Sequence, residues 1–370
     1  MKNESTKLSH RKTRAHALLV GVALGLLAVN AARAGVAGAR QYLKNPDAWF
    51  KTSDAARIGE NILSHQSDLG GWPKNEDTTA APFTGDRSHI KPTFDNNATT
   101  DELRFLARFQ NATHDARSRG AFARGLDYIL KAQYPTGGWP QYFPPDSKYH
   151  RRITFNDNSM VRLMEFLRET CTSDRYAFLD AARKKAAREA FDRGIGCILK
   201  CQIRVDGRLT AWCAQHDEND YSPQPGRAFE LTSISGSESV GITRLLMSLD
   251  PPGTDVIRAV EAAVAWFRSA QLKGIRLVEK SNGSSSKKKK HEVVEDAKAP
   301  PVWARFYDIR TNAPIFSDRD GVVKQHIDEI SSERRNGYAW YGTWPAALLE
   351  TEYPAWRQKW AAKIGAPAKK

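Results

Sequence analysis

A motif that recurs three times constrains the fold of this chain more than any other feature of its sequence. In each copy an Ile-Leu pair, two variable residues and a glutamine are followed by glycine and tryptophan. The copies are Ile62–Gln66 with Gly-Gly-Trp-Pro at 70–73, Ile129–Gln133 with Gly-Gly-Trp-Pro at 137–140, and Ile198–Gln202 with Gly207 and Trp212. A repeat of about 67 residues indicates supersecondary units that stack on one another.

The residues upstream of the copies have helical periodicity. Apolar side chains recur at helical spacing before the second copy (Phe122, Leu126, Ile129) and before the third (Ala187, Phe191). The glycines are expected to stop each helix, and the tryptophan to fill the turn that follows. Residues 266–271 are expected to open a fourth copy.

A polar loop and a second helix follow each turn. The loops are Thr93–Thr99, Thr154–Met160 and Leu231–Ser237, and we expect Asx or Ser caps to open the helices after them. Strand signals are few and lie mainly after residue 300, as in 302–309. We therefore predict an all-α-dominated fold, an (α/α)3 toroid with long irregular loops and a few short strands. The second helices of the three hairpins would line its inside.

The N-terminus has the features of a secretory signal. A basic leader precedes the apolar run 17–29, and Ala32 and Ala34 are the small residues that a signal peptidase reads. We predict a cleaved signal over residues 1–34, rather than an uncleaved anchor, and a single domain over 35–370. The mature protein is then secreted or periplasmic, monomeric and not membrane-bound, since no later segment could span a bilayer.

The charge of the chain suggests an anionic partner. Lysine and arginine number 56 against 42 acidic residues, and the leader contributes five of the fourteen excess positive charges. An exported basic protein typically binds an acidic polysaccharide or an anionic surface, whereas export argues against nucleic acid. The plainer alternative is that the charge only favours solubility. The basic stretch Ser281–Lys290 is interpreted as a solvated insertion without a role in the site.

The four cysteines leave their redox state open. Their spacing fits no zinc motif. Cys201 and Cys213 bracket a short turn and could pair in an oxidising compartment, whereas Cys197 and Cys201 lie one helical turn apart, where disulfide geometry is poor.

Two aspartates in the polar loops are candidate metal ligands. Asp95 and Asp157 stand in the corresponding loops of the first two repeats, among asparagines and cationic residues. Loops before inner helices lie on the same rim of a toroid, so the two carboxylates would converge. Converging carboxylate and amide oxygens suit Ca²⁺. The alternative is that both aspartates only cap helices.

Nine segments spread over most of the chain match those of a known family in the same order. They are GGWPKN (70–75), TFDNNAT (93–99), GGWPQYFP (137–144), RRITFNDNSM (151–160), WCAQHD (212–217), GRAFELTSISGSESVGI (226–242), WARFYD (303–308), DRDG (318–321) and ERRNGYAWYGTWP (333–345). On these segments the sequence resembles the family 10 polysaccharide lyases, which are pectate lyases. Two differences are the insertion at 281–290 and Asn97, where glycine is expected.

The resemblance implies an (α/α)3 toroid and Ca²⁺-assisted β-elimination on (1,4)-α-D-galacturonan, which gives 4,5-unsaturated oligogalacturonates. It also implies a role for individual residues: Asp95 and Asp157 as metal ligands with Asn96 or Asn158 in addition, Arg227 as the base, Arg305 and Arg319 as binders of substrate carboxylates, and Lys74 as a further partner of the substrate.

The chemistry explains why cations are needed. Elimination removes the C5 proton next to a carboxylate, and positive groups stabilise the charge that develops there. Arginine is a weak candidate for the base because its ordinary pKa lies above about 12, although neighbouring cations would favour its neutral form. His216 and Glu230 are the local alternatives, and only His216 ordinarily titrates near neutrality.

Other function classes fit parts of the sequence. A glycoside hydrolase would need two carboxylates, either Asp95 with Asp157 or Asp217 with Glu230, and would leave saturated products. A non-catalytic polyanion-binding protein would use arginines and tryptophans. Its candidate arginines are Arg151, Arg152, Arg334 and Arg335. The glycine-tryptophan turns also suggest a terpene cyclase toroid, but the loops are polar and have no acid-rich cluster.

Overall fold

The computed structural model describes residues 38–145, 149–280 and 290–364. The predicted signal peptide at 1–34 lies outside the described residues. Of the insertion 281–290, only the backbone of Lys290 is described. In the described part of the chain, no helix is both long enough and apolar enough to cross a membrane.

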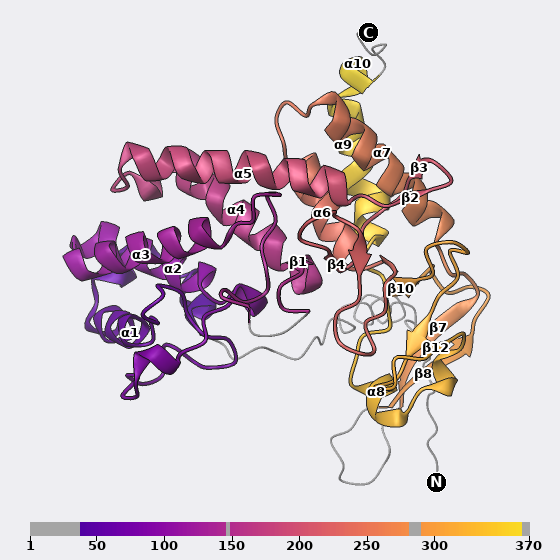
Figure 1. Ribbon diagram of the computed structural model, residues 1–370, viewed down its shortest axis with the longest axis horizontal. Coiled ribbons are helices and arrows are strands. Elements are labelled where there is room, and N and C mark those ends of the chain that lie inside the picture. Colours follow the sequence, from indigo (N-terminus) through magenta and orange to yellow (C-terminus); the bar gives the residue numbers. More distant parts are fainter. Residues whose placement is uncertain (1–37, 146–148, 281–289, 365–370) are drawn as a thin grey trace, which may run out of the picture. The chain divides into compact units, whose positions relative to one another are not determined.

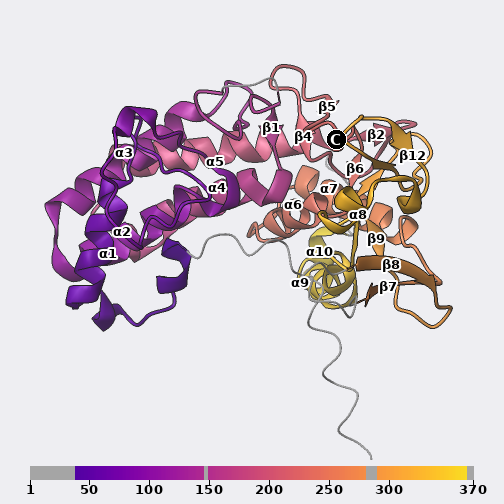
Figure 2. The ribbon, with the colours of Figure 1, turned by 90° about the horizontal axis from the view of Figure 1, so that it is seen from below.

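The described chain is dominated by helices in two rows. The outer row contains α1, α3, α5 and α7, each in contact with the next, and the inner row contains α2, α4 and α6 (Figures 1 and 2). The bounds are α1 Ser53–Ser64, α2 Thr100–Thr113, α3 Ala116–Ala132, α4 Ser159–Thr172, α5 Ala181–Cys201, α6 Glu238–Met247, α7 Thr254–Ser269, α8 Ser332–Asn336, α9 Tyr353–Lys359 and α10 Ala361–Ile364. This arrangement confirms the predicted all-α-dominated toroid class, with inner helices following the polar loops.

Short strands tie the loops together. Three of them form the antiparallel sheet β1-β4-β5, in which Ile153 lies opposite His216, and the others form pairs. The bounds are β1 Ile153–Thr154, β2 Arg204–Val205, β3 Arg208–Leu209, β4 Gln215–His216, β5 Pro223–Gln224, β6 Ile234–Ser235, β7 Ile275–Lys280, β8 Lys290–Glu295, β9 Trp303–Ala304, β10 Phe306–Tyr307, β11 Phe316–Ser317, β12 Val323–Lys324 and β13 Tyr341–Gly342.

The expectation that strands lie mainly after residue 300 was wrong. Strands β1 to β8 all precede that position, and the insertion joins the two strands of the β7–β8 hairpin. Six of the eight are only two residues long, so they have no alternating pattern that a sequence could reveal.

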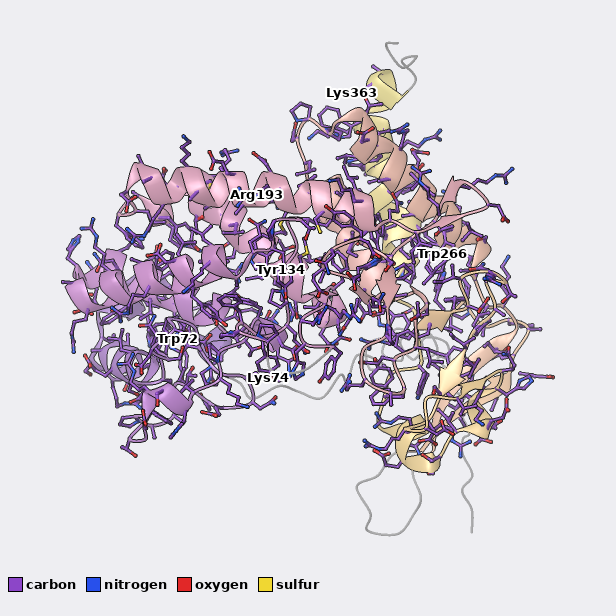
Figure 3. All side chains as sticks on the ribbon, viewed as in Figure 1. Trp72, Lys74, Tyr134, Arg193, Trp266 and Lys363 are labelled. Carbon is purple, nitrogen blue, oxygen red and sulfur yellow. The ribbon has the colours of Figure 1, made fainter. Side chains whose placement is uncertain are left out.

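The repeated tryptophans close each turn onto the preceding outer helix. The indole nitrogen of Trp72 donates to the Ile62 carbonyl at 2.7 Å, and Figure 3 shows Trp72 among the side chains of the first repeat. The same bond recurs in the other copies: Trp139 to Ile129 at 2.9 Å, Trp212 to Ile198 at 2.8 Å, and Trp303 to Phe267 at 2.8 Å. The last bond confirms the fourth copy, whose turn tryptophan is Trp303.

The repeated glutamines join each turn to the next outer helix. The side-chain amide of Gln66 donates to Gly70 O at 2.7 Å, in its own turn, and to Ala121 O at 2.8 Å, on α3. Gln133 makes the same pair of bonds to Gly137 and Ala190, and Gln202 to Thr210 and Ala259. One side chain per repeat therefore satisfies carbonyls of two successive units.

The first glycine of each Gly-Gly pair is required by this packing. Gly70 and Gly137 have φ angles of +104° and +93°. A Cβ on Gly70 would lie 2.6 Å from Arg124 O, and one on Gly137 would lie 2.3 Å from Arg193 O. Any side chain would push the next outer helix away.

The helix caps differ from those expected. Side chains of Thr52, Asp115 and Asp180 cap the outer helices α1, α3 and α5. The inner helices α2 and α4 instead begin without a side-chain cap, after residues with positive φ, Thr99 (72°) and Asn158 (60°). Asp95 and Asp157 therefore do not cap the helices that follow them, which removes the simplest structural explanation for both carboxylates.

Replacing the glutamine of the first repeat should destabilise the fold. Gln66→Ala leaves two carbonyls without their donor, and buried groups stranded in this way cost about 1–3 kcal/mol each. Chemical denaturation should show a lower free energy of unfolding for this variant. The control is Gln358→Ala, at an exposed position on α9, which should leave stability unchanged. Equal stability of both variants would show that the two hydrogen bonds of the Gln66 side chain are not needed for stability.

Candidate active site

Asp95 lies buried in the first polar loop and is already neutralised by a cation. Its side chain is 4% exposed, and its Oδ2 accepts from Lys74 Nζ at 2.5 Å and from Gln141 Nε2 at 2.8 Å. Its Oδ1 accepts from the backbone N–H of Asn96 at 2.9 Å. Burial alone would lower the pKa of Lys74, but the Asp95 carboxylate raises it above its ordinary value. Lys74 therefore stays charged. It lies among the loops outside the helices (Figure 3).

Asp157 lies in the second polar loop and is more accessible. Its side chain is 42% exposed, with Oδ1 3.3 Å from Arg305 Nη2 and Oδ2 accepting from Asn156 Nδ2 at 2.9 Å. Asn158 has its Oδ1 packed against Gly241 of α6. Of the two asparagines predicted as extra ligands, Asn96 is therefore exposed and Asn158 faces α6.

The two aspartates lie in corresponding turns, as expected, but at neighbouring rather than equivalent positions of the turn. The short 3-10 turns are Asp95–Asn97 and Asn156–Asn158. Asp95 corresponds to Asn156, and both are buried. Asn96 (φ 53°) corresponds to Asp157 (φ 51°). The conformation repeats while the acidic residue shifts by one position, so one carboxylate points inward and the other is half-exposed.

Helix α4 brings the two turns together. It begins directly after the second turn and contacts the first. The pKa of Arg162 on α4 is lowered, mainly by burial and to a smaller extent by the positive charge of Arg40. The carboxylates of Asp157 and Asp95 partly offset this by raising it. Arg162 therefore lies within electrostatic range of both aspartates. Sequence reasoning missed it, because an arginine on a helix after an apolar residue carries no distinctive signal.

Arg227 is held by an acidic neighbour. It forms an ion pair with Glu230, and its backbone N–H donates to Glu230 Oε2 at 2.9 Å. Its guanidinium lies 4.8 Å from the ring centre of Phe229 and 5.7 Å from that of Tyr338. Burial works against its charge, but Glu230 raises the pKa of Arg227 above its ordinary value. The expectation that neighbouring cations favour its neutral form is not met in this state.

Arg305 lies deeper and is tightly paired. It is 8% exposed and forms an ion pair with Glu238 in addition to its contact with Asp157. Burial opposes its charge, but Glu238 raises the pKa of Arg305. Arg319 differs: its side chain is 67% exposed and lies 3.1 Å from Glu333. Its hydrogen bond with Glu333 raises the pKa of Arg319, and the charge of Arg227 lowers it.

Tyr338 links the arginines and was missed in the sequence. Its hydroxyl donates to Glu230 Oε1 at 2.9 Å, and its ring lies 4.7 Å from the guanidinium of Arg305. Arg334, also buried, lies 4.1 Å from the ring centre of Phe229. The rings belong to a small second core with Phe306, Phe316 and Trp340. The signal that could have identified this cluster is the density of arginine and aromatic residues in ERRNGYAWYG.

His216 is a structural residue and is not available as a base. It is fully buried, its Nε2 accepts from the Cys213 N–H at 3.1 Å, and its Nδ1 lies 2.8 Å from Tyr221 O. Burial lowers its pKa to about 4. The other local alternative, Glu230, is engaged by Arg227 and Tyr338; burial opposes its charge, but Arg227 lowers its pKa.

The cysteines are all free thiols. Cys201 and Cys213 do not pair, and Cys197 Sγ lies 4.0 Å from Cys201 Sγ without a bond.

Comparison with known proteins identifies the family. A family profile described as pectic acid lyase matches residues 66–349. The chain belongs to the family 10 polysaccharide lyases. An aspartate-to-alanine mutant of a family 10 polysaccharide lyase from Cellvibrio cellulosa, in complex with trigalacturonic acid, is 34% identical, with a TM-score of 0.72 over 89% of this chain and 97% of that one. The family 10 lyase from the same organism is 34% identical, with a TM-score of 0.72 over 88% and 96%. No curated protein sequence matched the chain.

Membership of this family makes the protein a pectate-type polysaccharide lyase and overturns the readings as a hydrolase, a terpene cyclase or a non-catalytic binder. The four arginines named for the polyanion-binding alternative form ion pairs within the protein, Arg334 with Glu333 among them. Arg151 and Arg152 pair with Glu218 and Asp217, and Arg335 pairs with Asp328. Asp217, a carboxylate of the hydrolase alternative, is thus neutralised by Arg152.

The stability of this lyase should depend on His216 between pH 6.5 and 4. The unfolded imidazole takes up a proton near pH 6.5 and the folded one only near 4, so the unfolded state binds more protons in this window. This histidine alone therefore lowers the free energy of unfolding by about 3 kcal/mol as the pH falls. Buried Glu102, whose pKa burial raises to about 7, has the opposite effect between about 4.5 and 7.

The measurement is therefore a difference between two proteins. Urea unfolding of the wild type and of His216→Gln is compared at each pH, which cancels the contribution of Glu102. The destabilisation caused by the substitution should shrink as the pH falls from 6.5 to 4. A difference that stays constant across this range would show that His216 is not held neutral.

Proposed function

We propose that this lyase cleaves (1,4)-α-D-galacturonan by β-elimination, with Ca²⁺ held by Asp95 and Asp157 and with Arg227 as the base. The observation that carries the proposal is the gathering of Arg227 and Arg305 around Tyr338, with Arg305 reaching Asp157. The related lyase in complex with trigalacturonic acid supports the substrate class. We also propose that residues 1–34 direct the enzyme out of the cytoplasm and that the exported enzyme acts as a monomer.

The donor atoms around the two aspartates fit a hard cation. The carboxylates themselves offer only oxygens, and two side-chain amides each donate to one aspartate through nitrogen, Gln141 to Asp95 and Asn156 to Asp157. Within the described part of the chain, the amide oxygens of Gln141 and Asn156 are buried without a hydrogen-bond partner. Turning either amide would exchange its nitrogen for oxygen at the carboxylate, and such an exchange is compatible with a bound cation.

The protein supplies only part of a calcium coordination sphere. Among the described residues, no three histidine, cysteine or acidic side chains are grouped as a metal site. Ca²⁺ takes about six to eight oxygens, so Asp95 and Asp157 would hold it together with amide oxygens, water and substrate carboxylates. When bound, it would help to neutralise the uronate carboxylate next to the reacting carbon.

The arginines have distinct tasks in this mechanism. Arg305, fixed by Glu238 and by the ring of Tyr338, presents a rigid guanidinium to a substrate carboxylate, and exposed Arg319 can bind another. Arg227 takes the C5 proton, the electrons of that bond form the C4–C5 double bond, and the O4 oxygen leaves and takes a proton from water. Lys74, which neutralises Asp95, is a further partner for the acidic chain.

Product analysis tests the reaction type. Purified protein is mixed with polygalacturonate and Ca²⁺, and the ultraviolet absorbance of the conjugated product is followed. Elimination gives an absorbance that rises with time, whereas hydrolysis gives new reducing ends without it.

Arg227→Lys should remove nearly all kcat and change KM little, because it keeps the charge but moves the basic nitrogen. Arg319→Lys should instead raise KM, since an exposed arginine that binds carboxylate acts already in the ground state. Arg357→Lys on α9 is the control. A near-normal kcat for Arg227→Lys would rule out Arg227 as the base.

The activity of the wild type should rise well into the alkaline range, because Glu230 keeps the Arg227 pKa high.

Chelation should abolish turnover, and added Ca²⁺ should restore it. Asp157→Asn should weaken Ca²⁺ binding measured by calorimetry, since it removes the more exposed of the two carboxylates. Asp255→Asn on α7, also exposed, is the control. Full activity in excess chelator would contradict the calcium assignment while leaving elimination itself intact.

A further inference from the structure

A pocket of about 480 Å³ lies beside Lys74, and the proposed reaction uses none of its lining residues except Lys74. Three segments form it: the residues that follow Trp72, the loop before the first aspartate turn, and the chain that follows Trp139. The lining residues are Pro73, Lys74, Asn75, Glu76, Phe83, His89, Ile90, Lys91, Tyr142 and His150. Its volume is within the range of about 300–1,000 Å³ that small-molecule sites occupy.

The lining combines aromatic rings with positive charge. Lys74 Nζ lies 5.2 Å from the ring centre of Tyr142, and the Tyr142 and His150 rings are 4.7 Å apart. Lys91 adds a second ammonium group, and Glu76 is the single acid among the lining residues. An aromatic ring offers an apolar face to the C–H groups of a sugar, and ammonium groups bind a carboxylate. Such a lining suits an anionic sugar better than a neutral or apolar ligand.

The pocket adjoins the candidate active site through one shared side chain. Lys74 lines the pocket and also lies 2.5 Å from Asp95. Tyr149, whose ring centre is 4.0 Å from that of His150, lies toward Arg227: burial raises its pKa, and the charges of Arg227 and Lys74 both lower it. A polymer bound at the aspartates and at Arg227 can therefore continue past Lys74 into the pocket.

We propose that this pocket is an outlying subsite that binds one uronate residue of the polymer, with the sugar ring against Tyr142 and the carboxylate among the cationic groups. The inference rests on the proposed function and extends it from the bond that is cleaved to the length of chain that the enzyme recognises. Binding energy from a remote sugar residue can lower the barrier only for substrates long enough to reach the pocket.

The test compares the variants Tyr142→Leu and Tyr221→Leu on galacturonate oligomers of increasing length. Tyr221 is a matched control, because Lys200 lies 5.1 Å from its ring centre as Lys74 does from that of Tyr142. Tyr142→Leu should lower kcat/KM about five- to tenfold for long oligomers, the size expected of one aromatic contact. The shortest oligomer that is cleaved should be affected less than about twofold, and Tyr221→Leu should show no dependence on length.

Lys91→Gln tests the carboxylate. It should reduce kcat/KM for long unesterified oligomers and have a smaller effect on methyl-esterified ones, since only the former carry the charge that Lys91 would bind. An equal loss at all lengths would overturn the proposal by placing Tyr142 in the catalytic machinery, and no loss at any length would overturn it by showing that the pocket binds nothing.

Failure of the proposed reaction would be seen separately. If the wild type yields no unsaturated product, calorimetric binding of the same oligomers still decides whether the pocket is a subsite. In that measurement Tyr142→Leu should weaken the binding of long oligomers more than that of short ones. A variant that binds both as the wild type does would reject the subsite.

Discussion

The side-chain hydrogen bonds of the repeated glutamine and tryptophan hold the rest of the structure in place. The tryptophan joins its turn to the helix before it, and the glutamine joins the same turn to the outer helix of the next repeat. The polar loops are fixed to the same framework, because the Phe94 N–H donates to Gln141 O at 3.1 Å, and the Phe155 N–H to Ala214 O at 2.8 Å. Each loop is thus positioned by the residues that follow the next repeat's tryptophan. Asp95 is oriented by Gln141, so the second repeat sets the geometry of a carboxylate in the first.

The helical repeats and the C-terminal segments supply opposite charges. The repeats position two aspartates, while Arg227, Arg305 and Arg334 lie against a small aromatic core that Phe229 and residues 306–340 form. Burying Arg305 would cost several kcal/mol if it were unpaired. Glu238 on the inner helix α6 and Asp157 offset that cost, and they also fix where the guanidinium points. Ion pairs therefore hold the C-terminal segments to the helical repeats at the place where an acidic substrate is proposed to bind.

Much of the architecture could be read from the sequence, because the repeat is expressed in residues that make local contacts. Gln66, Trp72 and the first glycine of each pair act within their own turn or on the next helix, so spacing alone revealed them. The two aspartates could be proposed from the repeated loops, whereas Arg227, Arg305, Arg319 and Lys74 could be proposed only through the family resemblance. The one-residue shift between Asp95 and Asp157 is visible when TFDNN (93–97) is aligned with TFNDN (154–158), but its consequence is not: only the folded turn shows that one carboxylate is buried and the other half-exposed. Tyr338 and Arg162 were missed for a different reason. Their roles come from groups distant in the chain, such as Glu230 for Tyr338 and Asp95 for Arg162.

The pairing of Arg227 with Glu230 gives the proposed mechanism its main physical difficulty. A base must give up its proton before it can accept another, yet Glu230 and, more weakly, Tyr338 and Asp157 favour the charged guanidinium. In the proposed mechanism, Asp157 would present less negative charge to Arg227 once it holds a cation, and substrate carboxylates would bind Arg305 beside Glu238 and would bind Arg319 in place of Glu333. Glu230 also accepts a hydrogen bond from Tyr338, which spreads its charge over two donors. The base is therefore expected to become available only when the site is filled, so the resting enzyme keeps Arg227 protonated, and loss of its proton is coupled to binding of the substrate.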